Sequence, residues 1–193
     1  AGAGGRWMEG GAGYAAIERT PGGASELVRY DTATGRRDVL MTAAQLTPPA
    51  LGKPLQVADY AMSADGRRML FATSGRPTMI RKTAYDYWTL DKTNGEWRKL
   101  GGGAATDPPG LKTRPPSGET RPPSVEESPN DGLLYAKLSP DGSRAAYVRG
   151  NNLFVEDLRT GTTTALTSDG SPVIINGTSD WVYEEELGLR DAF

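Results

Sequence analysis

A turn pattern that recurs at matching places constrains the fold of this chain more than any other feature. From Leu134 the sequence reads LYAKLSPDGSRAAYVRGNNLFVEDLRTGTTTALT. It predicts four short strands joined by turns at Ser139–Gly142, Gly150–Asn152 and Arg159–Gly161. Proline at the second position and glycine at the fourth position of Ser-Pro-Asp-Gly suit a type I turn between antiparallel strands.

Two earlier segments carry the same turns in the same order. DYAMSADGRRMLFAT holds the turn Ser63–Gly66, and YDYWTLDKTNGEWRKL holds Thr93–Gly95. A partial copy, RWMEGGAGYAAIE followed by ELVRYDTATGRRDVL, ends its last hairpin at Thr34-Gly35. Tandem four-strand units of about 40 to 45 residues are typical of a β-propeller. A β-sandwich is the alternative, but the matched turns favour an all-β, partial β-propeller.

The repeat is interrupted by a segment rich in proline. Residues 101–131 contain seven of the chain's 14 prolines, which predicts an exposed inserted loop. The remaining residues of the 193 suffice for about three to four blades, whereas closed propellers use about 4 to 8. We therefore expect residues 1–193 to be the N-terminal part of a larger propeller domain.

Two residue types are missing, and their absence excludes several kinds of chemistry. The chain has no cysteine and no histidine, so it cannot form a disulfide, a Ser-His-Asp relay or a zinc site of the usual kind. It also has no G-x-S-x-G motif, and we expect no metal, no cofactor and no catalytic residue in this chain. The net charge of -2 argues against nucleic acid as a partner, and no apolar run is long enough for a membrane span.

Three consecutive carboxylates, Glu184 to Glu186, stand in the string NGTSDWVYEEELGLRDAF at the end of the chain. Such a cluster is electrostatically costly and calls for a cation. Asp180 can cap a short helix over Trp181–Leu187, and Gly188 is placed to end it.

Adjacent helix positions point about 100° apart, so two neighbouring glutamates of this helix can face one cation from two sides. The alternative is a solvated acidic helix end in which Glu186 and Arg190 form an i, i+4 ion pair. The aromatic residues of the repeats are expected to pack between blades; they are Tyr87, Trp88, Trp97 and Trp181.

The chain resembles the N-terminal propeller of the dipeptidyl peptidase IV family of serine peptidases, especially its bacterial members. The resemblance runs from LSPDGSRAAYVRG to the specific string DWVYEEE, and back through DYWTLDKTNGEWRKLGG and LTPPALGKPLQVADYAMSADGRRMLF to RWMEGGAGYAAIE. It covers nearly the whole chain except the proline-rich loop. It implies an eight-bladed propeller followed by an α/β-hydrolase domain that carries the catalytic serine and histidine.

The resemblance also implies roles for particular residues. Glu185 and Glu186 correspond to the glutamates that bind the free α-amino group of a peptide, and Glu184 is then expected to point elsewhere and to be structural. The peptide is cut after its second residue, which is proline or alanine. Arg81 corresponds to an arginine that hydrogen-bonds the substrate's backbone carbonyl. Its spacing to Tyr87 is one residue shorter than in the family, so a surface strand arginine is an equal alternative.

The function that follows is the substrate-binding and gating part of an exopeptidase that releases N-terminal dipeptides, with this chain inactive by itself. The expected partners are a peptide with a free N-terminus, the rest of the propeller with its hydrolase domain, and a second copy in a homodimer. The family resemblance implies a periplasmic or secreted location. The alternative is a non-catalytic propeller that serves as a binding or scaffold module.

Overall fold

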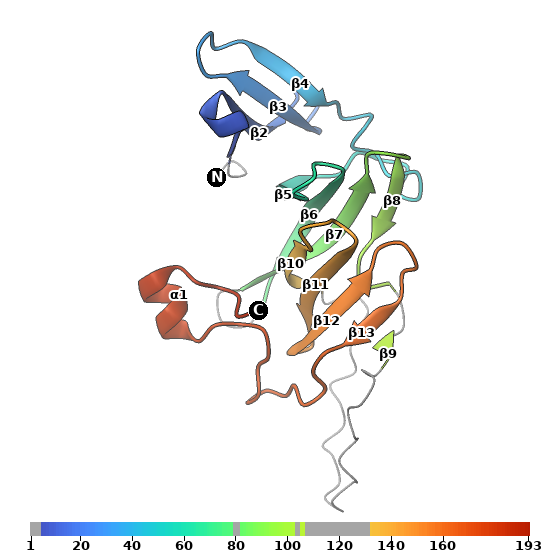
Figure 1. Cartoon of the computed structure of the whole chain (residues 1–193), viewed down its shortest axis with the longest axis vertical. Coiled ribbons are helices and arrows are strands. Elements are labelled where there is room, and N and C mark those ends of the chain that lie inside the picture. The colour runs from blue at the N-terminus through green and yellow to red at the C-terminus, as the bar shows by residue number, and fades with distance from the viewer. Residues whose placement is uncertain (1–4, 79–81, 103–104, 107–131) are drawn as a thin grey trace, which may run out of the picture.

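The computed structural model describes residues 5–78, 82–102, 105–106 and 132–193. These residues form three β-sheets that follow one another along the molecule, and one short helix, α1 (Trp181–Leu187) (Figure 1). Each sheet contains four antiparallel strands in chain order. The prediction of a partial β-propeller is confirmed, and each sheet is one blade.

The first two blades are consecutive four-stranded meanders. The first blade consists of β1 (Arg6–Met8), β2 (Gly13–Arg19), β3 (Ser25–Asp31) and β4 (Arg37–Met41). The second blade consists of β5 (Val57–Met62), β6 (Arg68–Pro77), β7 (Thr83–Asp91) and β8 (Glu96–Lys99). A 3-10 turn, Glu9–Gly11, joins β1 to β2.

The third blade takes up one strand from outside its own repeat. Its meander consists of β10 (Leu134–Leu138), β11 (Arg144–Arg149), β12 (Asn152–Asp157) and β13 (Thr163–Ala165). A two-residue strand, β9 (Ala105–Thr106), pairs parallel with β13 at the outer edge. Of the predicted loop, residues 103–104 and 107–131 lie outside the described residues, whereas residues 105–106 form β9.

The turns that define the repeat have the conformation that the sequence predicts. The Gly66 amide donates to the Ser63 carbonyl oxygen, and the Gly142 amide donates to the Ser139 carbonyl oxygen, each over 2.9 Å. Both glycines have positive φ, +70° and +67°. The two turns also touch, because the Ala64 amide donates to the Pro140 carbonyl oxygen over 3.1 Å. The repeated turns therefore help to align the second and third blades.

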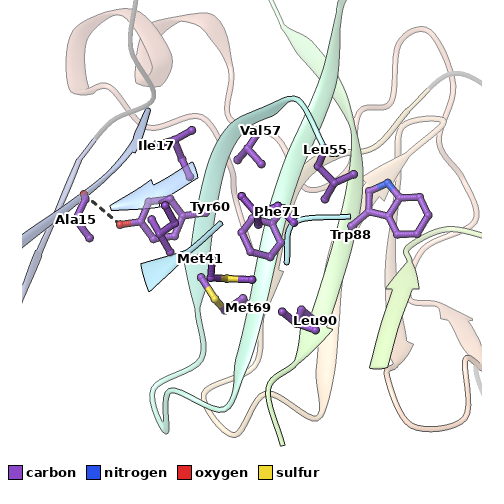
Figure 2. Close-up of a cluster of buried hydrophobic side chains, with 12 residues drawn as sticks. Ala15, Ile17, Met41, Leu55, Val57, Tyr60, Met69, Phe71, Trp88 and Leu90 are labelled. Atoms are coloured by element: carbon purple, nitrogen blue, oxygen red, sulfur yellow. Dashed lines mark hydrogen bonds between the residues drawn. The ribbon is translucent and has the colours of Figure 1, made fainter. Parts of the chain in front are cut away.

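The first core lies between the first and second blades (Figure 2). It is continuous across the two sheets, and the Tyr60 hydroxyl donates to the Ala15 carbonyl oxygen over 3.2 Å from one blade to the other. The buried side chains of the two blades in this core are Ala15, Ile17, Leu27, Met41, Val57, Tyr60, Met69, Phe71, Trp88 and Leu90.

A second core lies between the second and third blades. Its buried side chains are Leu70, Ala72, Tyr87, Leu100, Leu133, Ala145, Tyr147, Phe154, Leu158 and Ala165. Successive residues of a strand point to opposite faces. On β6, Met69 and Phe71 accordingly enter the first core, while Leu70 and Ala72 enter the second. The second blade is buried on both faces, as an inner blade of a propeller must be.

The aromatic residues divide into packed and exposed ones. Tyr87 and Trp88 are buried, and Trp97 packs against the first core. Trp181 is 67% exposed, so the prediction that it packs between blades is wrong. It lies on α1, which contains no buried residue.

Replacing Gly142 by alanine tests the contact between the two repeated turns. A Cβ atom there would lie 3.0 Å from the Ser63 Cβ and 3.2 Å from the Arg68 Cβ. Gly35 has a similar φ of +69° but no atom within 4 Å of such a Cβ, so Gly35→Ala is the matched control. We expect urea unfolding of the intact protein to show a loss of about 1 kcal/mol for Gly35→Ala and about 2–4 kcal/mol for Gly142→Ala. Equal losses would contradict packing between the turns.

The carboxylate of Asp141 makes the turn of the third blade sensitive to acid. It accepts hydrogen bonds from the Ser139 hydroxyl over 2.6 Å and from the Ser143 amide over 3.1 Å, and these lower the pKa of Asp141 to about 2. A lowered pKa stabilises the fold above about pH 4, and this contribution is lost as the pH falls towards about 2.

We therefore expect Asp141→Asn to destabilise the protein at pH 6 and to cost less as the pH falls below about 4. Thermal unfolding of the intact protein and of the variant across this pH range checks the prediction. A difference in stability that does not change with pH would contradict it.

Candidate functional site

The helix that carries the three glutamates begins and ends where the sequence predicts. Asp180 Oδ1 accepts hydrogen bonds from the amides of Val182 and Tyr183, both over 3.0 Å. Gly188 adopts a left-handed conformation with φ of +67°, and its amide donates to the Glu184 carbonyl oxygen. A capping aspartate and a terminating glycine thus fix the length of α1 at two turns.

The three glutamates of α1 differ in their surroundings. Glu184 is turned towards the protein, with 23% of its side chain exposed, and its Oε1 lies 3.7 Å from the Arg190 Nε. Glu185 and Glu186 are exposed, and neither forms an ion pair within the part of the chain that the structure describes. Arg190 therefore pairs with Glu184, not with Glu186 as in the alternative interpretation of the sequence.

The ends of the segment around α1 are joined to each other. Thr178 and Asp191 form an isolated antiparallel bridge. The Ser179 amide donates to the Arg190 carbonyl oxygen over 3.2 Å, and the Ser179 hydroxyl donates to the Leu189 carbonyl oxygen. We call residues 178–191 the α1 loop. These contacts make it a closed loop that presents Glu185 and Glu186 away from its neck.

A pocket of about 650 Å³ lies between the α1 loop and the second and third blades. The loop contributes Glu184, Arg190 and Asp191, while the blades contribute strand residues and Lys82. Four tyrosines from three strands line it: Tyr60, Tyr85, Tyr87 and Tyr135. Glu185 and Glu186 are not among its lining residues. Glu184, which lines the pocket, thus directly precedes Glu185 and Glu186, which do not.

Two tyrosines of this pocket, Tyr87 and Tyr135, are neutral hydrogen-bonding groups at physiological pH. Burial raises the pKa of Tyr87 to about 12. Burial, and next the charge of Glu184, raise the pKa of Tyr135. Their hydroxyls therefore stay protonated beside the charged side chains of the pocket, which include both cations and carboxylates. Such a mixture suits a ligand with polar backbone groups.

The third candidate site residue and two other sequence expectations concern the rest of the chain. Arg81 lies outside the described residues, although Lys82, the next residue, lines the pocket. The described residues contain no cluster of three or more acidic side chains that could hold a metal ion. No helix in the described part of the chain is long and apolar enough to cross a membrane.

Three residues that line the pocket could not be predicted from the sequence: Tyr85, Tyr135 and Lys137. They stand in strands whose turns were recognisable, but nothing in the local pattern shows which strand positions line the pocket. Tyr135 has a positive φ of +56°, a property of the fold and not of the sequence.

Comparison with known proteins gives one family and several relatives. Residues 63–193 match the family model described as the dipeptidyl peptidase IV N-terminal region. A probable dipeptidyl peptidase 4 of Emericella nidulans is 51% identical over 59 residues, which are 31% of this chain and 7% of that protein. Dipeptidyl peptidase 4 of Trichophyton tonsurans is 51% identical over 53 residues, 28% of this chain and 7% of that protein. The matches thus span a small part of these relatives.

A solved structure extends the similarity of fold to almost all of the chain. The crystal structure of Porphyromonas gingivalis dipeptidyl peptidase 4 matches 98% of this chain and 23% of its own, with a TM-score of 0.69 and 24% identity. At this identity the match supports the fold alone. It agrees with the three propeller blades described above.

Proposed function

The chain belongs to the family of dipeptidyl peptidase IV N-terminal regions, and from this membership we propose that it is the substrate-binding part of a serine exopeptidase that releases N-terminal dipeptides. In this proposal Glu185 and Glu186 bind the free α-amino group of the peptide. The serine, histidine and aspartate that cut the peptide bond belong to a hydrolase domain outside this chain.

The single observation that carries the proposal is the state of the three adjacent carboxylates. Glu184 is paired with Arg190, whereas Glu185 and Glu186 are exposed and form no ion pair within the described residues. Two adjacent carboxylates without a cation repel each other, and an ammonium group relieves the repulsion. A charged α-amino group is the cation that a peptide substrate supplies.

Binding the amino group at a fixed place also sets the length of the product. If the amine is held by Glu185 and Glu186, only the peptide bond two residues away can reach a nucleophile at a fixed distance. We extend the proposal to Arg81 as the group that hydrogen-bonds a substrate carbonyl, because a guanidinium is permanently charged and has several donors. Proline or alanine as the second residue is part of the same proposal.

The partners and the location are proposed from the family membership. We propose that the three blades are completed by further blades and by a hydrolase domain that closes over the amine site and gates access to it. A homodimer and a periplasmic or secreted location are part of the proposal. The longer reading frame should then contain a G-x-S-x-G motif and a histidine after it.

Neutralising each glutamate in the intact protein tests the amine clamp. We expect Glu185→Gln and Glu186→Gln each to lower kcat/KM for a glycyl-prolyl reporter peptide by about 100-fold, because each removes one charge that faces the ammonium group. Activity should also fall as the pH rises above about 8, where the substrate amine loses its proton.

Glu96→Gln is the matched control, since it neutralises an exposed glutamate in the second blade, and we expect it to leave turnover unchanged. Unaltered turnover in both clamp variants would remove the assignment. The alternative, a non-catalytic binding module, predicts no turnover in the intact protein at all.

A further inference from the structure

The α1 loop lacks the hydrophobic anchor that normally orients a helix. α1 has seven residues and no buried side chain, and Figure 1 shows it standing apart from the sheets. Isolated helices of this length are not stable in water, where about 12–15 residues are needed even for marginal stability. The direction in which Glu185 and Glu186 point must therefore be set by contacts outside the helix.

The contacts within the loop do not set this direction. The Thr178–Asp191 bridge and the hydrogen bonds of Ser179 close the neck, and Asp180 caps the helix. All of these groups belong to the loop itself. They fix its internal shape but leave its orientation to the blades undetermined.

One ion pair joins the α1 loop to a strand. Lys137 on β10 pairs with Asp191 at the neck of the loop. Among the residues that the structure describes, it is the only hydrogen bond or ion pair between residues 178–191 and the three sheets. Lys137 Nζ also donates to the Phe193 carbonyl oxygen over 3.2 Å and lies 4.8 Å from the centre of the Phe193 ring. Lys137 thus also contacts Phe193, two residues after the end of the α1 loop.

A bulge in β10 that contains a strained residue places Lys137 beside Asp191. Leu134 pairs with Val148 and Lys137 pairs with Ala146, so two residues of β10 lie opposite one residue of β11 between these pairs, and the strand contains a bulge. In a regular strand, residues three positions apart point to opposite faces, but the bulge places Leu134 and Lys137 on the same face.

The bulge contains Tyr135 with φ of +56°, which is unfavourable for a bulky residue. Strain of this kind is destabilising and persists where the surrounding structure enforces it. Here the strained strand brings Lys137 to the loop, and Tyr135 itself lines the pocket with Glu184. The bulge therefore links the backbone of the third blade to the orientation of α1.

We propose that Lys137 and Asp191 are positioning residues of the amine clamp: their ion pair tethers the α1 loop to β10 and fixes where Glu185 and Glu186 meet the substrate. The inference rests on the proposed function. Neither Lys137 nor Asp191 needs to touch the substrate. The tether acts on binding of the substrate amine, since the groups that cut the peptide lie elsewhere.

Kinetics of the intact protein with a glycyl-prolyl reporter tests the tether. We expect Lys137→Met and Asp191→Asn each to raise KM by about tenfold while kcat stays within about twofold, because a displaced clamp weakens binding and leaves the chemical step unchanged. Lys137→Arg keeps the charge and should keep KM. The exchanged pair, Lys137→Asp with Asp191→Lys, should restore most of the lost binding.

Arg36→Met is the matched control, because it breaks the exposed Arg36–Asp38 pair on the first blade and should leave KM unchanged. An unchanged KM in both single variants overturns the inference, as does a raised KM that the exchanged pair fails to lower. If Lys137→Met unfolds at a lower temperature than the unaltered protein, the KM values of Lys137→Arg and of the exchanged pair decide whether the tether exists.

The failure of the tether and the failure of the proposed function are separable. Inactive Glu185→Gln and Glu186→Gln variants beside a normal Lys137→Met variant would overturn the tether and support the clamp. Full activity in the glutamate variants would contradict the proposed function itself.

Discussion

Burial of the second blade on both faces is the interaction on which the rest of the structure depends. Its strand β6 alternates between two cores, with Phe71 in the first and Leu70 in the second. Complete burial of a large apolar side chain contributes about 1.5–3 kcal/mol. This two-sided packing holds the first and third blades in sequence. It also brings β5, β7 and β10 together, and these strands form the wall of the pocket beside α1.

The α1 loop is held by different interactions from those that hold the blades. The blades are held by apolar burial, whereas the α1 loop is held by a cap at Asp180, a closed neck and the ion pair between Lys137 and Asp191. Exposed ion pairs are individually weak, at about 0.2–1 kcal/mol. A loop held in this way can orient Glu185 and Glu186 although it is not packed into a core. Such a loop leaves both carboxylates accessible to a ligand that comes from solvent.

The parts of the structure that local chemistry determines could be predicted from the sequence. The turn at Ser139–Gly142 and the helix from Trp181 to Leu187 both follow from residues that suit one backbone conformation. What could not be predicted depends on contacts between distant segments. The bulge at Tyr135, the exposure of Trp181 and the pairing of Arg190 with Glu184 are decided by which strands and loops meet in space. The role of Glu185 and Glu186 stays a prediction that rests on the family.

A structure of the intact protein with a bound dipeptide tests the amine clamp most directly. We expect the peptide's α-amino nitrogen to lie within about 2.7–3.2 Å of carboxylate oxygens of both Glu185 and Glu186. An amino group bound elsewhere, with the two glutamates still facing solvent, would contradict the clamp.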